Sequence, residues 1–325
     1  MLVLSATEVV SLLDLDALAD ALQTAMVDLS AGQASVPPRV AALVPGRDAM
    51  LAAMPAYLPS AGALTTKLVS LFPRNQNRPT HQALICCFDP ATGTPVAVID
   101  GTYVTAARTA AGSALATRLL ARPGASQVAV IGTGVQARAH ARALARLPGV
   151  QTVLIAGRDQ SKAKALAGEL TTAGVPAQAL ASAEDAVRSA DVVCTTTHAA
   201  SPVLLREWLR PGTHINSVGY NNSGEGEVDS ATIRDALVVV ESRAAALAPF
   251  PAGAVELRRA IEHNVIDASH IVEVGQIAAG TARGRTGDTQ LTLYKSVGVA
   301  VQDAAAAALI LATAQERGAG THITM

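Results

Sequence analysis

The chain has 325 residues, of which 50% are hydrophobic, 16% are charged and 2% are aromatic, and its formal net charge is −1. This length suits two domains of ordinary size. The near-neutral charge argues against a nucleic-acid-binding protein, and no window reaches the roughly 18 consecutive apolar residues of a membrane helix. Cys86, Cys87 and Cys194 lack the spacing of a disulfide framework or a zinc site, so we expect no metal and a cytoplasmic location.

The first third of the chain has the pattern of helices followed by short strands. Ser5 and Glu8 have the spacing of a capping box, which predicts a helix start within residues 5–31, where two helices are expected. Short apolar runs punctuated by Pro and Gly then predict a mainly antiparallel or mixed sheet. The runs are Arg39–Leu43, Ala49–Ala53, Leu64–Phe72, Ala83–Phe88 and Pro95–Asp100. An Ala-rich helix is expected over Thr105–Leu120.

Beyond Gly124 the pattern changes to strands that alternate with helices. Five apolar runs predict buried strands: Gln127–Ile131, Val153–Ala156, Asp191–Cys194, His214–Val218 and Ala236–Val240. Strands that alternate with helices predict a parallel sheet with right-handed crossovers. A final helix is expected over about Lys295–Arg317, and we expect it to pack back onto the first domain.

The strongest local motif is Gly132-x-Gly134-x-x-Ala137 between a predicted strand and a predicted helix. The first Gly permits a tight turn, the second lets the backbone approach a pyrophosphate, and the small third residue lets the helix lie close to the strand. We therefore expect a dinucleotide site. At the end of the next predicted strand Arg158 favours the 2′-phosphate of NADPH, whereas Asp159 could bind the ribose of NADH or cap a helix.

Further motifs are spread along the chain. They include Thr66-Lys67, Pro79-Thr80-His81-Gln82, Ala107-Arg108-Thr109, Pro211-Gly212-x-His214, Glu227-x-Asp229 and Tyr294-Lys295-Ser296-x-Gly298. In this order, from about residue 36 to residue 312, they resemble the ornithine cyclodeaminase/μ-crystallin family. The resemblance implies an α/β fold with a Rossmann-type domain over 117–296. It also implies a discontinuous α+β domain, 1–116 with 297–325, that holds the substrate and forms a homodimer.

The resemblance also assigns a substrate site. Arg39, Lys67 and Arg108 match the carboxylate-binding cations of the family, Asp229 matches the acid beside the substrate amine, and His81 matches a histidine near the pocket. Lys67, Asp229 and His81 are the expected catalytic residues. The alternatives are an internal ion pair for Arg108, a helix N-cap for Asp229 and a solvent-facing strand position for Lys67.

Two departures from the family pattern concern the substrate alone. Arg74 and Arg78 add two cations, so Arg74 is a candidate for binding a dicarboxylate such as iminosuccinate, although both could be surface charges. The stretch from Tyr220 to Val228 differs from the loops expected of ornithine or thyroid-hormone binders.

The expected cofactor residues follow the same resemblance. They are Thr109, Gly132, Thr133, Gly134, Val135, Gln136, Arg158, Asp159, Thr195, Val218, Gly219, Lys295 and Ser296. Lys295 could contact the nicotinamide end of the cofactor or only neutralise a nearby acid.

These expectations define an NAD(P)-dependent oxidoreductase that reduces a small 2-imino acid to an L-amino acid, an imino acid or ketimine reductase or an amino acid dehydrogenase. Hydride transfer to the α-carbon would need the carboxylate held in place and a proton supplied to the nitrogen. One alternative is an ornithine cyclodeaminase, a lyase that forms proline and ammonia. Another is a non-catalytic NADPH-binding protein of the μ-crystallin kind.

Overall fold

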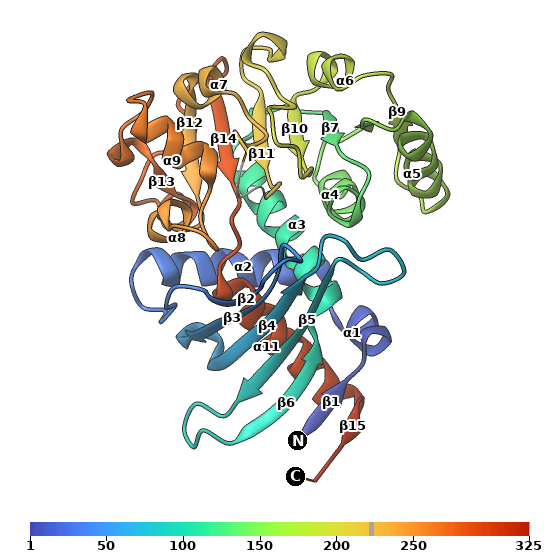
Figure 1. Cartoon of the computed structure of the whole chain (residues 1–325), viewed down its shortest axis with the longest axis vertical. Coiled ribbons are helices and arrows are strands. Elements are labelled where there is room, and N and C mark those ends of the chain that lie inside the picture. Colours follow the sequence, from blue (N-terminus) through green and yellow to red (C-terminus); the bar gives the residue numbers. More distant parts are fainter. Residues whose placement is uncertain (221–223, 325) are drawn as a thin grey trace. The chain divides into compact units, whose positions relative to one another are not determined.

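The computed structural model describes residues 1–220 and 224–324, and the chain forms two compact units (Figure 1). The first unit consists of Met1–Arg108 with Gly298–Met325, and the second is Thr109–Val297. One division falls within helix α3 (Gly101–Leu120) and the other falls just after strand β14 (Leu291–Lys295). The expected domain limits, after residues 116 and 296, fall in the same helix and in the same connection.

The first unit is built on a seven-stranded sheet in the order β15-β1-β6-β5-β4-β3-β2, antiparallel except between β1 and β6. Its strands are β1 (Leu2–Leu4), β2 (Val40–Val44), β3 (Ala49–Leu58), β4 (Ala63–Leu71), β5 (His81–Phe88), β6 (Pro95–Asp100) and β15 (Thr321–His322). Its further helices are α1 (Ala6–Leu12), α2 (Leu15–Ser30) and α11 (Ala300–Arg317), with the 3-10 turn η1 (Pro59–Ala61).

Helix α11 packs against β3, β4 and α2, as Figure 1 shows for this unit. Its consecutive buried alanines, Ala304–Ala307, have small side chains that let the helix lie close to the sheet. Along β4, residues with odd numbers are the more buried ones because successive side chains alternate between the two faces of a sheet. Lys67 is one of the buried residues and pairs in register with Met54 on β3 and Ile85 on β5. This register places its ammonium group in the core.

The second unit has an eight-stranded sheet in the order β13-β12-β14-β11-β10-β7-β8-β9, and its described strand pairs are all parallel. Its other strands are β7 (Gln127–Ile131), β8 (Thr152–Ala156), β9 (Ala177–Ala179), β10 (Val192–Thr195), β11 (His214–Ser217), β12 (Ala236–Val240) and β13 (Val272–Glu273). Its helices are α4 (Val135–Ala145), α5 (Gln160–Thr172), α6 (Ala183–Ser189), α7 (Ser230–Asp235), α8 (Arg243–Leu247), α9 (Val255–Glu262) and α10 (Val274–Ala278). The 3-10 turns η2 (Arg206–Trp208) and η3 (Ala268–His270) complete it.

The predicted fold class is confirmed, and three predicted elements need correction. Lys295 ends strand β14 instead of opening a helix, because β14 is buried between β11 and β12 and α11 starts only at Ala300. Strand β3 continues past Pro55, which the register allows because the pairing with β2 ends at Ala53, so the missing N–H of Pro55 lies beyond that ladder. Helix α3 begins at Gly101, one turn before the predicted Thr105.

The capping box is confirmed, since the Ser5 N–H donates to Oε2 of Glu8 over 2.8 Å. Within the described residues no helix is long and apolar enough to cross a membrane.

Candidate functional site

A glycine turn joins β7 to α4 in the second unit. Gly132 has a φ of +134°, and a β-carbon there would lie 2.4 Å from Oγ1 of Thr196. Gly134 is the N-cap of α4, and a β-carbon added to it would meet no atom within 4 Å. Val135, in the first turn, is 66% exposed. The start of α4 is therefore exposed, and an exposed helix start after a glycine turn is the arrangement that receives a pyrophosphate.

The turn lies where the strand order of the sheet reverses. From β7 the chain continues to β8 on one side, whereas β10, which follows β9, pairs with β7 on the other side. Ligands of open α/β sheets bind at such a switch point, at the carboxyl ends of the strands. Gly157 closes the turn against β8, since a β-carbon there would lie 3.0 Å from Cγ2 of Thr133. The residues of the described turn therefore fit a dinucleotide.

The remaining expected cofactor residues lie mostly at the same ends of these strands. Thr195 ends β10, Lys295 ends β14, and Ser296 follows it. Val218 and Gly219 follow β11, while Gln136 is in the first turn of α4 and Thr109 is a buried residue of α3. Asp159 caps α5 by accepting from the N–H groups of Ser161 and Lys162, and Arg158 beside it is exposed.

The carboxylate of Glu227 links the segment at the end of β10 to the segment at the end of β11 by hydrogen bonds. Its buried carboxylate accepts from Oγ1 of Thr195 at 2.8 Å, from the N–H of Thr197 at 2.5 Å and from the N–H of Gly219 at 2.6 Å. Because one carboxylate takes all three donors, it fixes the ends of β10 and β11 with respect to each other. The sequence marks Glu227 only as part of a motif and predicts no role for it.

Lys295 has three acceptors around its ammonium group. It donates to the carbonyl of Gly219 at 2.7 Å and to Oγ of Ser217 at 3.3 Å, and it pairs with Oε1 of Glu256 at 2.8 Å. Lys295 and Glu256 are both buried. Of the two expected roles, this geometry supports neutralisation of a nearby acid. Ser296 beside it donates to Oε1 of Glu241 at 2.7 Å.

A charged cluster lies in the core of the first unit. Asp303, in the first turn of α11, pairs with Nζ of Lys67 at 2.7 Å and with Nε of Arg108 at 3.1 Å. The side chains of Lys67 and Asp303 are each 1% exposed, and Arg108 is buried. Three charged groups in the core are costly unless each has a partner. One carboxylate shared by two cations leaves an excess of positive charge that suits an anionic ligand.

Arg39 is linked to this cluster by a hydrogen bond to the backbone carbonyl of Gly298. Its Nη2 donates to the carbonyl of Gly298 at 3.1 Å, and Gly298 has a φ of +74°. A β-carbon at Gly298 would lie 2.8 Å from Nη1 of Arg108. The first unit thus brings together the three cations that the sequence assigns to the carboxylate, Arg39, Lys67 and Arg108.

The charges of the cluster shift the pKa values within it. Burial and then the positive charge of Arg108 lower the pKa of Lys67 to about 7, and these effects outweigh the opposing charge of Asp303. Burial alone would raise the pKa of Asp303, but the charges of Lys67 and Arg108 dominate and lower it. Asp303 therefore stays ionised at neutral pH, whereas Lys67 titrates near neutrality.

The charges of the cluster also shift the pKa of His81, which lies at the start of β5. Burial, and then the charges of Lys67 and Arg108, lower its pKa to about 4. Its imidazole is therefore neutral at physiological pH. A neutral imidazole can accept or donate one proton in a hydrogen bond, but it adds no further cation to the cluster.

Asp229 lies in the second unit, at the start of α7. It is the N-cap of this helix: Oδ1 accepts from the N–H of Thr232 at 3.0 Å, and Oδ2 accepts from the N–H of Arg206 at 3.2 Å. The alternative reading of Asp229 as a cap therefore describes its contacts. The neighbouring stretch that the sequence associates with substrate choice includes residues 221–223, which lie outside the described residues.

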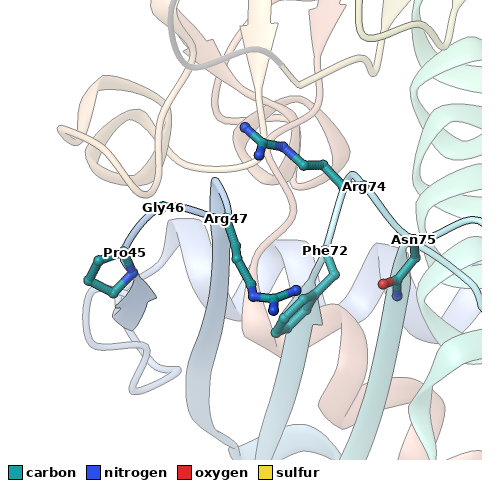
Figure 2. A pocket seen from close by; sticks show the side chains of 6 residues that line it. All are labelled: Pro45, Gly46, Arg47, Phe72, Arg74 and Asn75. Carbon is teal, nitrogen blue, oxygen red and sulfur yellow. The ribbon is translucent and has the colours of Figure 1, made fainter.

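Arg74 lies at a separate pocket of about 370 Å³ in the first unit, lined by Pro45, Gly46, Arg47, Phe72, Arg74 and Asn75. Figure 2 shows the guanidinium of Arg47 beside the Phe72 ring, whereas Arg74 extends away from that ring. Arg74 forms an exposed ion pair with Asp48 over 2.5 Å, its side chain being 69% exposed. None of the lining residues belongs to the cluster around Asp303.

Two polar residues of the cluster were missed by the sequence analysis, Gln302 and Asp303. Oε1 of Gln302 accepts from Nη1 of Arg108 at 2.9 Å. The signal available was the acid itself, since Asp303 is a lone charge before a run of alanines in a predicted buried helix. A buried acid needs a cation as its partner, and Lys67 and Arg108 were the expected buried cations.

A parallel sheet with a dinucleotide turn, together with a separate unit that holds a buried cluster of charged residues, defines a two-unit nucleotide-binding protein. The chain belongs to the ornithine cyclodeaminase/mu-crystallin family, whose model matches residues 1–318. The ketimine reductase mu-crystallin of Mus musculus is 37% identical over 262 residues, which are 80% of this chain and 79% of that protein.

Solved structures agree with this family. The Δ1-pyrroline-2-carboxylate reductase of Thermococcus litoralis, in complex with NADH and L-proline, matches with a TM-score of 0.93 and 34% identity over 99% of this chain and 100% of that one. An archaeal alanine dehydrogenase dimer with bound NAD has a TM-score of 0.92 and 33% identity, covering 100% and 99%. The iminosuccinate reductase of Paracoccus denitrificans, in complex with NAD⁺, has a TM-score of 0.90 and 29% identity, again covering 100% and 99%.

Proposed function

We propose that this protein is an NAD(P)H-dependent reductase that converts a small 2-imino acid into an L-amino acid. The observation that carries the proposal is the buried cluster in which Lys67 and Arg108 share the single carboxylate of Asp303. Such a cluster suits the carboxylate of an imino acid, and the turn at Gly132 suits the cofactor. The relatives and similar structures include a ketimine reductase, a Δ1-pyrroline-2-carboxylate reductase, an alanine dehydrogenase and an iminosuccinate reductase.

The first step of the reaction is the binding of the substrate carboxylate. Asp303 occupies Nε of Arg108 and one donor of Lys67, and Gln302 occupies Nη1 of Arg108. Lys67 has three donors and Arg108 has five, so donors remain for a carboxylate. Holding that carboxylate fixes which face of the C=N bond is presented, and much of the rate gain comes from such positioning.

NAD(P)H, when bound, supplies the hydride that reduces the imine carbon. The residues that would hold it are those of the turn, Gly132, Thr133 and Gly134, with the first turn of α4. The chain must also keep the imine nitrogen protonated so that the carbon accepts the hydride. We assign this task to Lys67, since its pKa of about 7 lets it hold or release a proton at neutral pH. His81, neutral at this pH, would orient the substrate through a hydrogen bond.

A catalytic role for Asp229 stays a prediction that one variant can test. Asp229→Ser keeps a side-chain oxygen for the N–H of Thr232, because Ser is a good N-cap, but it removes the acid. If Asp229 handles the amine proton, kcat falls by about two orders of magnitude, which is typical of a lost general acid. A kcat equal to that of the wild type would leave Asp229 as a helix cap only.

We propose a monocarboxylate substrate in preference to a dicarboxylate. Arg74, the candidate for a second carboxylate, is exposed and already pairs with Asp48. A dicarboxylate substrate is the competing hypothesis, because one of the similar structures is an iminosuccinate reductase. The kcat/KM values for Δ1-pyrroline-2-carboxylate and for oxaloacetate with ammonia decide between them. An Arg74→Gln variant that loses activity on the dicarboxylate alone would reverse our choice.

We also propose a homodimer formed through the sheet of the first unit. Leu84 on β5 is 48% exposed and Leu51 on β3 is 49% exposed, both at positions that alternate with buried residues. Large half-exposed leucines on one face of a sheet are typical of a protein interface. Leu84→Lys should convert a dimer into a monomer in analytical ultracentrifugation, whereas Val10→Lys on α1 should not. A monomeric wild-type protein would contradict this proposal.

The cytoplasm is the compartment that we propose, because the three cysteines are free thiols.

The cofactor preference follows from Arg158, which is exposed and so available to a 2′-phosphate; we expect NADPH to bind more tightly than NADH. Arg158→Gln should weaken NADPH and leave NADH unchanged.

The deciding experiment follows nicotinamide absorbance with NADH and with NADPH. The substrates are cyclic imino acids, and pyruvate with ammonia or methylamine, with ornithine assayed in parallel for ammonia release. Consumption of reduced cofactor with an imino acid supports the proposal. Ammonia from ornithine without net cofactor change would make the protein a cyclodeaminase. Cofactor binding without either reaction would make it a binding protein.

A further inference from the structure

Gln302 has a fixed orientation in the core of the first unit. Its side chain is fully buried in the first turn of α11. Oε1 accepts from Nη1 of Arg108 at 2.9 Å and from the N–H of Val299 at 3.2 Å. Both partners can only donate, so the oxygen must face them and the NH₂ group must face away.

The NH₂ group of Gln302 lacks a protein acceptor. Nε2 is buried and donates to none of the residues in 1–220 and 224–324. A buried donor without a partner destabilises a fold, and an acceptor supplied by a bound ligand would remove that cost. The amide oxygen binds the same guanidinium that is bound to Asp303, so an acceptor for Nε2 would have to lie close to this cluster.

We propose that Gln302 is a further substrate-binding residue, whose Nε2 donates a hydrogen bond to the carboxylate of the imino acid beside Arg108 and Lys67. This inference rests on the proposed function and adds to it a neutral donor that does not titrate. A neutral amide binds a carboxylate oxygen without adding a fourth cation to the cluster. It also favours substrates that carry the carboxylate over simple imines, because a substrate without it leaves the amide unsatisfied.

Gln302→Glu is the matched test. The carboxylate keeps an oxygen for Arg108 and for the N–H of Val299, but it replaces the donor with an acceptor that repels a carboxylate. Gln315→Glu, at an exposed position of the same helix, is the control. Binding of L-proline and of pyruvate is measured by calorimetry with the cofactor present, and reduction is followed for Δ1-pyrroline-2-carboxylate and for Δ1-pyrroline, which has no carboxylate.

We expect Gln302→Glu to weaken both carboxylates by about tenfold or more, the size of one charge-assisted hydrogen bond. The Kd for NADH and the behaviour of the control should not change, and the reduction of Δ1-pyrroline should fall less than that of Δ1-pyrroline-2-carboxylate. Gln302→Met, which is neutral, should also weaken both carboxylates, and it decides the matter if Gln302→Glu does not fold. Wild-type affinity in Gln302→Met would overturn the inference, as would a wild-type protein that binds neither carboxylate. A wild type that binds both but reduces no imine would refute the proposed function and leave the role of Gln302 intact.

Discussion

Gly298 leaves the space that the guanidinium of Arg108 occupies. A β-carbon at this position would lie 2.8 Å from Nη1 and 3.0 Å from Nη2. The same glycine has a φ of +74° and presents its carbonyl to Arg39. One residue without a side chain therefore sets the positions of two cations of the cluster.

Gly298→Ala should displace Arg108 as well as strain the backbone. We expect the KM for the imino acid to rise at least tenfold, with a loss of about 1–2 kcal/mol in stability from the positive φ. Gly318→Ala is the control, because Gly318 has a φ of +61° at the other end of α11 but no atom within 4 Å of an added β-carbon. It should lose similar stability with an unchanged KM. Equal KM values for the two variants would show that the space at Arg108 is unimportant.

Gly134→Ala separates cofactor binding from folding. Because an added β-carbon meets no atom within 4 Å, we expect the thermal midpoint without cofactor to stay within a few degrees of the wild type. The new methyl group would lie where the second glycine of such turns lets a pyrophosphate approach. The Kd for NADH, followed by fluorescence, should therefore rise by at least tenfold. A wild-type Kd would place the dinucleotide elsewhere.

Asp303→Asn should be strongly destabilising. It removes the only carboxylate that Lys67 and Arg108 share among the described residues, and breaking a buried ion pair from one side costs about 3–5 kcal/mol. Asp235→Asn, in a partly exposed pair with Arg206, should cost much less, because solvent screens such a pair. Urea unfolding measures both. Added pyruvate should restore part of the stability of Asp303→Asn, and an absence of this rescue would argue against an anion site.

The pH dependence of catalysis should report Lys67. Since its pKa is lowered to about 7 and its charged form binds the carboxylate, kcat/KM should fall as pH rises above about 7. Lys67→Arg keeps the charge at high pH, so the remaining activity should lose this limb of the profile. A profile of Lys67→Arg that still falls near pH 7 would assign the limb to another group.

Acid should destabilise the protein through its buried histidines. Burial is the main cause that lowers the pKa of His81 and His140 to about 4 and that of His214 to about 3, against about 6.5 in an unfolded chain. Between about pH 6.5 and pH 4 the unfolded chain binds more protons, so stability falls as pH falls. His140→Gln should reduce this slope by about 1.4 kcal/mol per pH unit, measured by urea unfolding at pH 7, 6 and 5. An unchanged slope would mean that His140 is not neutral in the native state.

Local patterns predict the second unit well. The strands β7 and β12 occur at the predicted residues, because a buried parallel strand is a continuous apolar run. Strand β14 was not predicted, and its last residue, Lys295, was predicted to start the final helix, because a short strand next to a helical sequence has no periodicity that separates the two. The pairs formed by β1 with β15 and with β6 join segments far apart in sequence, which no local pattern reports.

The sequence predicted the cations of the candidate substrate site but not their partners. Arg39, Lys67 and Arg108 were expected as cations, and they do meet in the structure. Asp303 and Gln302 were missed because the register that brings α11 onto β4 is a tertiary property. Asp229 illustrates the opposite difficulty, since an acid before a helix has the same local sequence whether it caps the helix or moves a proton.

The return of the chain to the first unit after Val297 has a consequence for synthesis on the ribosome. Thr109–Val297 is one continuous stretch, so all of its residues are available while the last segment is still being made. Met1–Arg108 lacks α11 until the last segment has been synthesised. Until that point Lys67 does not have Asp303 as its ion-pair partner. The nucleotide-binding unit, although second in sequence, is thus the first that can complete its own core, and the nascent segment Met1–Arg108 is the part most exposed to aggregation or to chaperones.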